Sequence, residues 1–358
     1  MLNARKAVQV MHEYHPPLAG RKGLRLDFNE NTDGCSPRVL ARIRQITAEE
    51  LARYPEREPV EALVAAHLGL AAEQALLTNG VDEAIHLMCE AYLEPQDEVI
   101  VVTPTFSMYE IFAEATGATV LRVQCEADLA FPLDKTLRAV TPATRLIAVA
   151  SPNNPTGGVA TREQLLAIAG SAPNAALLVD EAYYEFHGKT VLSDVVGHEN
   201  LFVARTFSKA YGLAGLRAGI LVGPRAQMPM VRRVSSPYSV NAVALAALPV
   251  ALRDREYVDN YVEQVKVGRV RLEQELTHAG IPWWPSQANF VLMKIGARHR
   301  EFVAAMRQRE ILVRDRSADP GCDGCVRITL GTVAQTDQML AVLREVVTEL
   351  KLGAEVRA

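Results

Sequence analysis

The sequence predicts an α/β fold in which a mostly parallel, seven-stranded sheet lies between layers of helices. Of the 358 residues, 49% are hydrophobic and 22% are charged, a composition typical of globular proteins. Seven short runs of Val, Ile, Leu and Ala alternate with amphipathic stretches through the middle of the chain. Continuous apolar strands separated by helices are typical of a parallel sheet that is buried on both faces.

The predicted strands and helices alternate from residue 75 onward. The strands cover 75–78, 99–103, 119–123, 146–150, 176–180, 201–206 and 218–223. Helices are predicted between several of them, at 81–93, 106–116 and 162–169. Before the first strand, Ser36 can cap a helix that has Pro37 in its first position, with apolar residues recurring at helical spacing after it.

The two ends of the chain have different patterns. Residues 1–35 contain Pro16-Pro17 and several glycines, which indicates an extended arm. A long amphipathic helix is predicted at 254–279, then strands at 289–294, 311–314 and 326–330, then a last helix with Met339, Leu343, Val346 and Leu350 on one stripe. We therefore expect three parts: the arm 1–35, a large α/β domain at 36–250 and a small α+β domain at 251–358.

Charge and hydropathy disfavour two classes of partner. The net charge is −4, from 38 Lys and Arg against 42 Asp and Glu. No basic run exceeds the two residues Arg232-Arg233, so nucleic acid is not expected as a partner. No apolar stretch approaches the roughly 18 residues of a membrane-spanning helix, and the N-terminus lacks the apolar core of a secretion signal. We expect a cytoplasmic protein.

The five cysteines do not predict a disulfide framework or a metal site. They are scattered along a long chain. Cys322 and Cys325 have C-x-x-C spacing, but no second C-x-x-C or His pair follows to complete the four ligands of structural zinc. Free thiols in a loop are the simpler interpretation.

The segment TFSKAYGLAGLRAG (206–219) carries the strongest chemical signal. Lys209 follows a predicted buried strand, which is an unusual place for a solvated charge. Thr206, Ser208 and Arg217 supply hydroxyl and guanidinium donors suited to a phosphate ester, and the glycines let backbone approach a ligand. A lysine beside a phosphate-binding set predicts a Schiff base with pyridoxal phosphate.

That cofactor makes further demands, and residues at other strand ends meet them. Asp180, at the end of a predicted strand, can keep the pyridine nitrogen protonated. Asn154 and Tyr183 can donate hydrogen bonds to the phenolic oxygen. Each short motif alone is weak, since Asn-Pro pairs also make ordinary turns. Because these motifs all fall at predicted strand ends in one domain, together they are stronger evidence for a cofactor site than any one of them alone.

The phosphate and the ring also need partners. A phosphate favours a helix N-terminus, and the strand–glycine–helix junction at Gly80 leaves the backbone N–H groups of Val81 and Asp82 free. Tyr109 follows another strand end and can cover the ring. Taken alone, Gly80 marks an ordinary helix start and Tyr109 a core residue.

These motifs resemble those of the fold-type I, class II pyridoxal-phosphate aminotransferases. SPNNPTG (151–157), DEAY (180–183) and TFSKAYGLAGLRAG (206–219) carry that resemblance. With LDFNEN (26–31), RYPE (53–56), NGVDEAI (79–85), VRDRS (313–317) and CVRITLGT (325–332), the chain is similar to the histidinol-phosphate aminotransferase family from about residue 14 to its C-terminus.

The resemblance implies roles for the cofactor residues. Lys209 would bind the cofactor covalently and later move a proton between substrate and cofactor, Asp180 would pair with the pyridinium nitrogen, and Asn154 and Tyr183 would hold the phenolic oxygen. Tyr109 would stack on the ring. The resemblance also implies that the phosphate binds at Gly80, Val81, Asp82, Thr206, Ser208 and Arg217, and that Tyr54 reaches it from the partner subunit of a homodimer.

The resemblance also implies a substrate site. Arg327 lies inside an apolar strand, where an unpaired guanidinium is costly, and would bind the anionic end of the substrate; a structural ion pair is the alternative. Arg314 would add a second cation for a phosphate group. Asn29 and Tyr14 resemble an N-terminal segment that covers the substrate, and Asn154 would contact it too.

The implied reaction is transamination between L-histidinol phosphate and 2-oxoglutarate, giving imidazole-acetol phosphate and L-glutamate, in L-histidine biosynthesis. An aromatic amino acid aminotransferase would need the same Lys209, Asp180 and Asn154. A phosphothreonine decarboxylase or a non-catalytic sensor on this fold are further alternatives. A nicotinamide-dependent oxidoreductase is weaker, because no G-x-G-x-x-G follows the first predicted strand.

Overall fold

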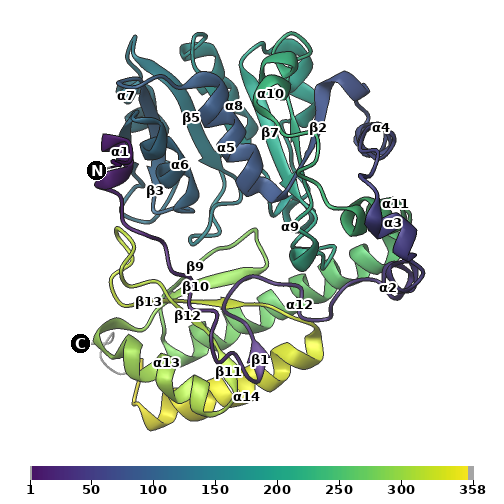
Figure 1. The fold of residues 1–358 in the computed structure, drawn as a ribbon. Coiled ribbons are helices and arrows are strands. Elements are labelled where there is room, and N and C mark those ends of the chain that lie inside the picture. The colour runs from purple at the N-terminus through teal and green to yellow at the C-terminus, as the bar shows by residue number, and fades with distance from the viewer. Residues whose placement is uncertain (1, 354–358) are drawn as a thin grey trace.

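The computed structural model describes residues 2–353 and is built around a seven-stranded sheet (Figure 1). The strand order is β2-β8-β7-β6-β5-β3-β4. The strands are β2 (Ala75–Thr78), β3 (Glu98–Thr103), β4 (Thr119–Gln124), β5 (Thr144–Ala150), β6 (Ala176–Asp180), β7 (Leu201–Thr206) and β8 (Gly219–Val222). The seven predicted strands are present, with ends that differ by no more than two residues.

The sheet is parallel except at one strand. β8 pairs antiparallel with both β7 and β2, whereas the other neighbours run parallel. A parallel return needs a long crossover, usually a helix. The β7–β8 connection contains only a short 3₁₀ helix, η3 (Ala214–Leu216), so the chain turns back beside β7. Lys209 lies in this connection.

Helices cover both faces of the large sheet, as predicted. Alternate strand residues point to opposite faces, so Leu76 and Leu77 belong to different hydrophobic clusters. One face packs against α5 (Gly80–Tyr92), α6 (Met108–Thr116) and α10 (Met228–Val234). The other packs against α4 (Glu58–His67), α8 (Arg162–Ser171) and α11 (Ala242–Arg253).

Several helices were not predicted from the sequence. They include α4, α10 and α11, together with α7 (Leu133–Ala139) and α13 (His299–Gln308). α11 is apolar on most of its surface and contains Pro249, so it lacks an amphipathic stripe. The predicted helix after Ser36 is α2 (Pro37–Arg44), and the Ser36 hydroxyl accepts from the Arg38 N–H as expected of an N-cap. Short helices α1 (Lys6–Gln9), α3 (Ala48–Ala52) and α9 (Tyr184–His187) complete this part.

A second sheet is antiparallel, with strand order β12-β13-β10-β9. Its strands are β9 (Trp283–Trp284), β10 (Phe290–Lys294), β12 (Arg314–Asp315) and β13 (Cys325–Thr329). Figure 1 shows α12 (Arg255–Ala279), α13 and α14 (Val333–Glu349) below this sheet. The predicted strand 311–314 is in fact two strands: β11 (Ile311–Leu312) pairs with β1 (Leu24–Arg25) of the N-terminal arm, and β12 pairs with β13.

The arrangement brings three distant segments to one place. The carboxyl ends of β5, β6 and β7 meet at one edge of the large sheet, where sites form in α/β proteins. The backbone N–H of Leu26 donates to the Leu312 carbonyl, and that of Thr329 to the Leu26 carbonyl. These bonds fix the N-terminal arm against the small sheet.

In the described part of the chain, no helix is both long and apolar enough to cross a membrane.

Candidate active site

Ten predicted cofactor residues line one cavity of about 170 Å³ at the carboxyl edge of the large sheet. They come from α5, α6, the turn after β5, β6 and the turn after it, the end of β7 and the β7–β8 connection: Val81, Asp82, Tyr109, Asn154, Asp180, Tyr183, Thr206, Ser208, Lys209 and Arg217. The topology thus unites residues that span more than a hundred positions of the sequence.

Lys209 is half-buried at this cavity. Its Nζ donates to the Phe28 carbonyl at 3.2 Å and lies 5.9 Å from the ring centroid of Tyr183. Burial and the nearby Arg327 guanidinium lower the pKa of the Lys209 amine to about 8. The neutral amine, which is the form able to accept a proton or attack a carbonyl, is therefore accessible near neutral pH.

Asp180 ends β6 and is almost fully buried. Its Oδ2 accepts from the Tyr109 hydroxyl at 2.5 Å, and its Oδ1 accepts from the Ala182 N–H at 2.9 Å. Burial raises the pKa of the Asp180 carboxyl to about 6. A buried carboxylate that forms no ion pair within residues 2–353 is a ready partner for a cationic group. Tyr109 is thus hydrogen-bonded to Asp180, a contact that the sequence did not predict.

The Tyr183 hydroxyl belongs to a series of buried hydrogen bonds that extends into the N-terminal arm. Its hydroxyl accepts from Asn29 Nδ2 at 2.8 Å. Asn29, with φ of 55°, is fixed in turn by Thr329, which donates to its Oδ1 at 3.0 Å, and by Asn289, which donates to its carbonyl at 3.1 Å. Because the Tyr183 oxygen is an acceptor in this chain, its own hydrogen is available to donate. Burial raises the Tyr183 pKa and keeps the hydroxyl neutral.

A cradle for an anionic group forms where α5 begins. Gly80 has φ of 76°, and a Cβ placed there would lie 2.6 Å from Arg217 Nη2, so a residue with a side chain would fill the space. Arg217 Nη2 donates to Asp82 Oδ2 at 2.8 Å. The Thr206 hydroxyl donates to the Ser208 hydroxyl at 2.9 Å nearby. A helix N-terminus, a guanidinium and two hydroxyls fit a phosphate ester.

Arg327 is buried in β13 without an ionic partner. Its Nη2 donates to the Asp27 carbonyl at 2.7 Å, its Nη1 donates to Asn154 Oδ1, and its Nε has no hydrogen-bond partner among residues 2–353. No carboxylate of those residues lies within 4.0 Å of it. Burial, with Arg316 and Arg314 nearby, lowers the pKa of Arg327 to about 9. A structural ion pair, the alternative considered for this residue, is absent from the described chain.

Arg314 lies directly opposite Arg327 in the β12–β13 pair. Residues directly opposite each other in an antiparallel pair share a face, and like charges there repel. The Arg314 guanidinium also stacks over the Phe28 ring, 5.0 Å from its centroid, and Arg21 stacks over the same ring at 4.5 Å. An anion between the two opposed arginines would relieve their repulsion.

Two predicted site residues that do not line the cavity are exposed to solvent. Tyr54 is 80% exposed, and its ring stacks on Tyr238 with centroids 4.5 Å apart. Tyr14 is 44% exposed on the N-terminal arm. The described chain by itself brings neither residue to Lys209. Tyr54 is the residue that we expect a partner subunit to supply.

The sequence analysis did not identify the residues that fix the site residues through hydrogen bonds. Thr329 and Asn289 fix Asn29, Phe28 contributes its carbonyl to Lys209, and Arg21 holds Asp27 through paired bonds of 3.1 and 2.6 Å. Phe28 and Thr329 lay within the quoted motifs LDFNEN and CVRITLGT, which was a usable signal. Asn289 and Arg21 gave none, because only the tertiary contacts reveal their partners.

A phosphate cradle, a buried carboxylate and a half-buried lysine of lowered pKa at one cavity fit pyridoxal 5′-phosphate, and together with the fold they define a pyridoxal-phosphate enzyme. The chain belongs to the aminotransferase class I and II family, whose model matches residues 21–343. Pyridoxal 5′-phosphate is the cofactor, and the predicted family and cofactor are confirmed.

The chain is similar to histidinol-phosphate aminotransferases in sequence and in structure. One from Dehalococcoides mccartyi (strain CBDB1) is 36% identical over 326 residues, covering 90% of both proteins. The crystal structure of the enzyme from Sinorhizobium meliloti in complex with pyridoxal-5′-phosphate has a TM-score of 0.89 and 25% identity, over 98% of this chain and 99% of that one. These likenesses confirm the predicted fold class.

The fold alone does not identify the substrate. The crystal structure of an L-threonine-O-3-phosphate decarboxylase from Porphyromonas gingivalis has a TM-score of 0.79 over 91% of this chain and 99% of that one, at 23% identity. That likeness shows the shared fold only. The substrate must therefore be argued from the site.

Proposed function

We propose that the enzyme transfers the amino group of L-histidinol phosphate to 2-oxoglutarate, giving imidazole-acetol phosphate and L-glutamate, as a step of L-histidine biosynthesis. The observation that carries this proposal is the opposed pair Arg314 and Arg327. Two guanidiniums on one sheet face suit a phosphate, which carries more charge and more acceptor oxygens than a carboxylate. The histidinol-phosphate aminotransferases similar to this chain support the same substrate.

A negatively charged substrate fits the buried Arg327 guanidinium, which has no carboxylate partner within residues 2–353. Its guanidinium has a carbonyl and an amide oxygen for partners and an unpaired Nε. A substrate phosphate, or the side-chain or α-carboxylate of glutamate, would give this buried cation the counter-charge it lacks. Arg314 would serve the longer phosphate-bearing substrate, while glutamate could rely on Arg327.

The bound cofactor supplies the electron sink on which transamination depends. Lys209 moves the proton, and its lowered pKa keeps a useful fraction of its amine neutral near neutral pH. Asp180 would provide the negative charge that holds a proton on the pyridine nitrogen. Tyr183 and Asn154 would donate to the phenolic oxygen, and the Asn29–Thr329 contact fixes the Tyr183 hydroxyl in position.

We also propose a homodimer with shared active sites, in which Tyr54 of each subunit reaches the cofactor phosphate of the other. An exposed tyrosine held by stacking on Tyr238 is pre-ordered for such a contact. We place the enzyme in the cytoplasm, because all five cysteines are free thiols and four of them are buried.

The deciding experiment is a half-reaction followed by absorbance. Holoenzyme is mixed, without any keto acid, with histidinol phosphate, glutamate or phenylalanine. Fast conversion of the cofactor to its amino form by the first two, and slow conversion by phenylalanine, is the expected result. A preference for phenylalanine would move the enzyme to the aromatic aminotransferases. Release of carbon dioxide from phosphothreonine without 2-oxoglutarate would assign it as a decarboxylase, and no conversion by any of them would favour a sensor.

A further inference from the structure

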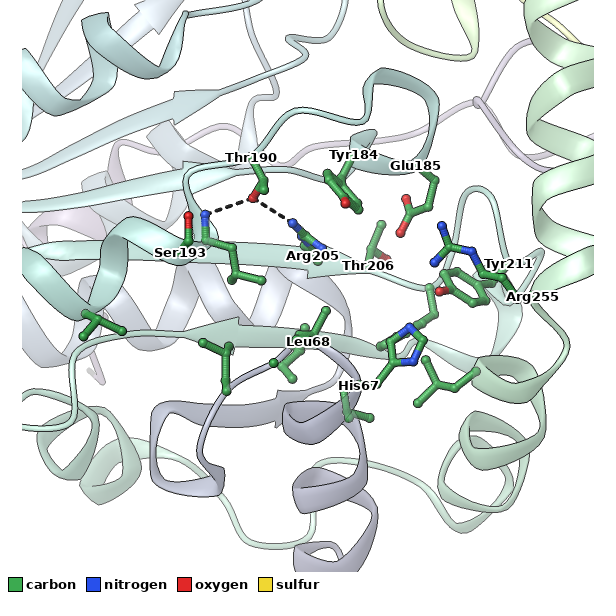
Figure 2. A pocket seen from close by; sticks show the side chains of 18 residues that line it. His67, Leu68, Tyr184, Glu185, Thr190, Ser193, Arg205, Thr206, Tyr211 and Arg255 are labelled. Atoms are coloured by element: carbon green, nitrogen blue, oxygen red, sulfur yellow. Dashed lines mark hydrogen bonds between the residues drawn. The ribbon is translucent and has the colours of Figure 1, made fainter.

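A second cavity, of about 400 Å³, lies beside β7 and apart from the one that Lys209 lines. Its walls come from the end of α4, from α9, from the 3₁₀ helix η2 (Leu192–Gly197) and from the start of α12. Figure 2 shows its lining side chains. Thr206 is the residue common to both cavities. None of the residues with a proposed cofactor or substrate role, Thr206 excepted, lines it.

One wall of this cavity is a closed ion-pair network. Arg205 donates from Nε and Nη2 to Glu181 Oε2, at 2.9 and 2.8 Å, and from Nη2 to the Thr190 hydroxyl at 2.8 Å. Its guanidinium lies 3.5 Å from the Tyr184 ring centroid. Arg205 is therefore neutralised by Glu181 and forms part of the scaffold of the cavity.

The opposite side of the cavity presents two charges that are not paired with each other. Glu185 Oε2 is buried and has no hydrogen-bond partner within residues 2–353. In Figure 2 the Glu185 carboxylate and the Arg255 guanidinium lie next to each other at one end of the cavity, yet the described chain forms no ion pair between them within 4.0 Å. Arg255 is exposed, and among residues 2–353 its Nε forms an ion pair with Asp259 Oδ1 at 2.9 Å, which leaves its two Nη atoms for a further anion.

This arrangement is costly without a ligand. A buried carboxylate oxygen without a donor loses its hydration and gains nothing in return. Burial accordingly raises the pKa of Glu185 to about 7. A ligand that brings a cationic donor to Glu185 and an anion to Arg255 would satisfy both groups at once.

The other residues that line the cavity indicate what kind of ligand would bind to the two charges. Leu68, Leu70 and Leu252 form an apolar wall, and the exposed His67 and the Tyr211 ring border it. We propose that this cavity binds a free neutral α-amino acid, with its ammonium on Glu185, its carboxylate on Arg255 and its apolar side chain against the leucines. Neither an amine nor a carboxylic acid alone would satisfy both charges.

The test must prevent the probe from reacting with the cofactor in the first cavity. Enzyme reconstituted with pyridoxamine 5′-phosphate has no carbonyl with which an amino acid could condense there. Calorimetric titration of this form with L-phenylalanine is compared with 3-phenylpropanoate, which lacks the ammonium, and with phenethylamine, which lacks the carboxylate. We expect one L-phenylalanine per chain and binding of each analogue that is weaker by about tenfold or more.

Variants with matched controls locate the site. Glu185→Gln and Arg255→Gln should each weaken L-phenylalanine binding by about tenfold or more, whereas Glu256→Gln and Arg253→Gln, which make the same charge changes on neighbouring exposed residues, should not. Val196 lines the cavity but is 77% exposed, so Val196→Trp should fill the space without disturbing the fold.

Two results would overturn the proposal: no measurable binding of L-phenylalanine, or binding that survives Glu185→Gln, Arg255→Gln and Val196→Trp unchanged. Equal affinity for L-phenylalanine and either analogue would also overturn it, since the zwitterion would then not be recognised. The measurement uses no histidinol phosphate and no turnover, so its outcome is independent of the proposed function.

Discussion

At the scale of single residues, the buried carboxyl group of Asp180 lowers the stability of the cofactor-free protein. Its carboxyl pKa of about 6 in the folded chain, against 3.8 ordinarily, means that the folded state holds this proton more tightly than the unfolded state does. The cofactor-free protein therefore loses stability as pH rises between these two values, and the loss persists above them. The cost amounts to roughly 3 kcal/mol at neutral pH.

Asp180→Asn should consequently stabilise the cofactor-free protein at pH 7.5 and change its stability little at pH about 4, while transamination is lost. Thermal unfolding of cofactor-free protein at the two pH values measures this. Asp134→Asn, an exposed acid on α7, is the control. A stability gain of equal size at both pH values would show that burial of the charge is not the cause.

Lys209 offers a second prediction at this scale. Lys209→Ala should still bind pyridoxal phosphate, because the cradle around Gly80 and Arg217 is intact, but it should bind it without a covalent link and lose transamination. Absorbance of the bound cofactor, with denaturation to test for covalent attachment, reports both properties. Lys189→Ala, an exposed lysine, should behave as wild type. Full turnover by Lys209→Ala would refute the assignment.

The two opposed arginines give a prediction about specificity. Arg327→Gln should raise KM for both histidinol phosphate and glutamate, by about tenfold or more. Arg314→Gln should raise KM chiefly for histidinol phosphate, since its guanidinium is the additional cation. Steady-state kinetics with each substrate distinguishes the two, and Arg122→Gln, on the exposed face of β4, is the control. Equal effects of Arg314→Gln on both substrates would remove its proposed role.

At the scale of elements, α14 closes the small sheet and depends on its first turn. Thr332 accepts from the Gln335 N–H at 3.3 Å, and Gln335 Oε1 accepts from the Thr332 N–H at 2.9 Å, which together make a capping box. Gln335 also donates to the Thr32 carbonyl at 3.2 Å. The cap thus joins α14 to the N-terminal arm.

Thr332→Ala should destabilise the protein by about 1 kcal/mol, because one N–H at the helix start loses its acceptor. Thr332→Ser keeps the hydroxyl and should cost much less. Thermal midpoints of the holoenzyme compare the two variants. If alanine and serine lower the midpoint equally, the effect arises from the lost methyl group rather than from the cap.

At the scale of the whole molecule, the proposed sharing of Tyr54 predicts complementation. Lys209→Ala chains and Tyr54→Ala chains should each be impaired alone. After the two are unfolded and refolded together, mixed dimers contain one site with both native residues, so about one quarter of wild-type activity should return. Refolding each variant alone is the control, and activity no higher than the mean of the two controls would argue against shared sites.

The sequence by itself determined the large sheet, its strands and ten residues that line the cavity at the carboxyl edge of the sheet. Apolar runs and strand-end motifs are local signals, and parallel strands place such ends at one edge. The sequence could not determine the direction of β8, the division of 311–314 between two sheets, or α11. Each of these depends on what the segment packs against: β8 on a short connection, β11 on the N-terminal arm, and α11 on burial that leaves no amphipathic stripe.

The tertiary structure alone decided which groups meet. Lys209 and Phe28, Asn29 and Thr329, and Arg314 and Arg327 are brought together by pairing of β1 with β11 and of β12 with β13. It also placed Glu185 and Arg255, which no motif had singled out, next to each other at one end of a cavity. Composition and spacing report how a segment folds locally, whereas charges and hydrogen bonds act through space between segments that the sequence leaves far apart.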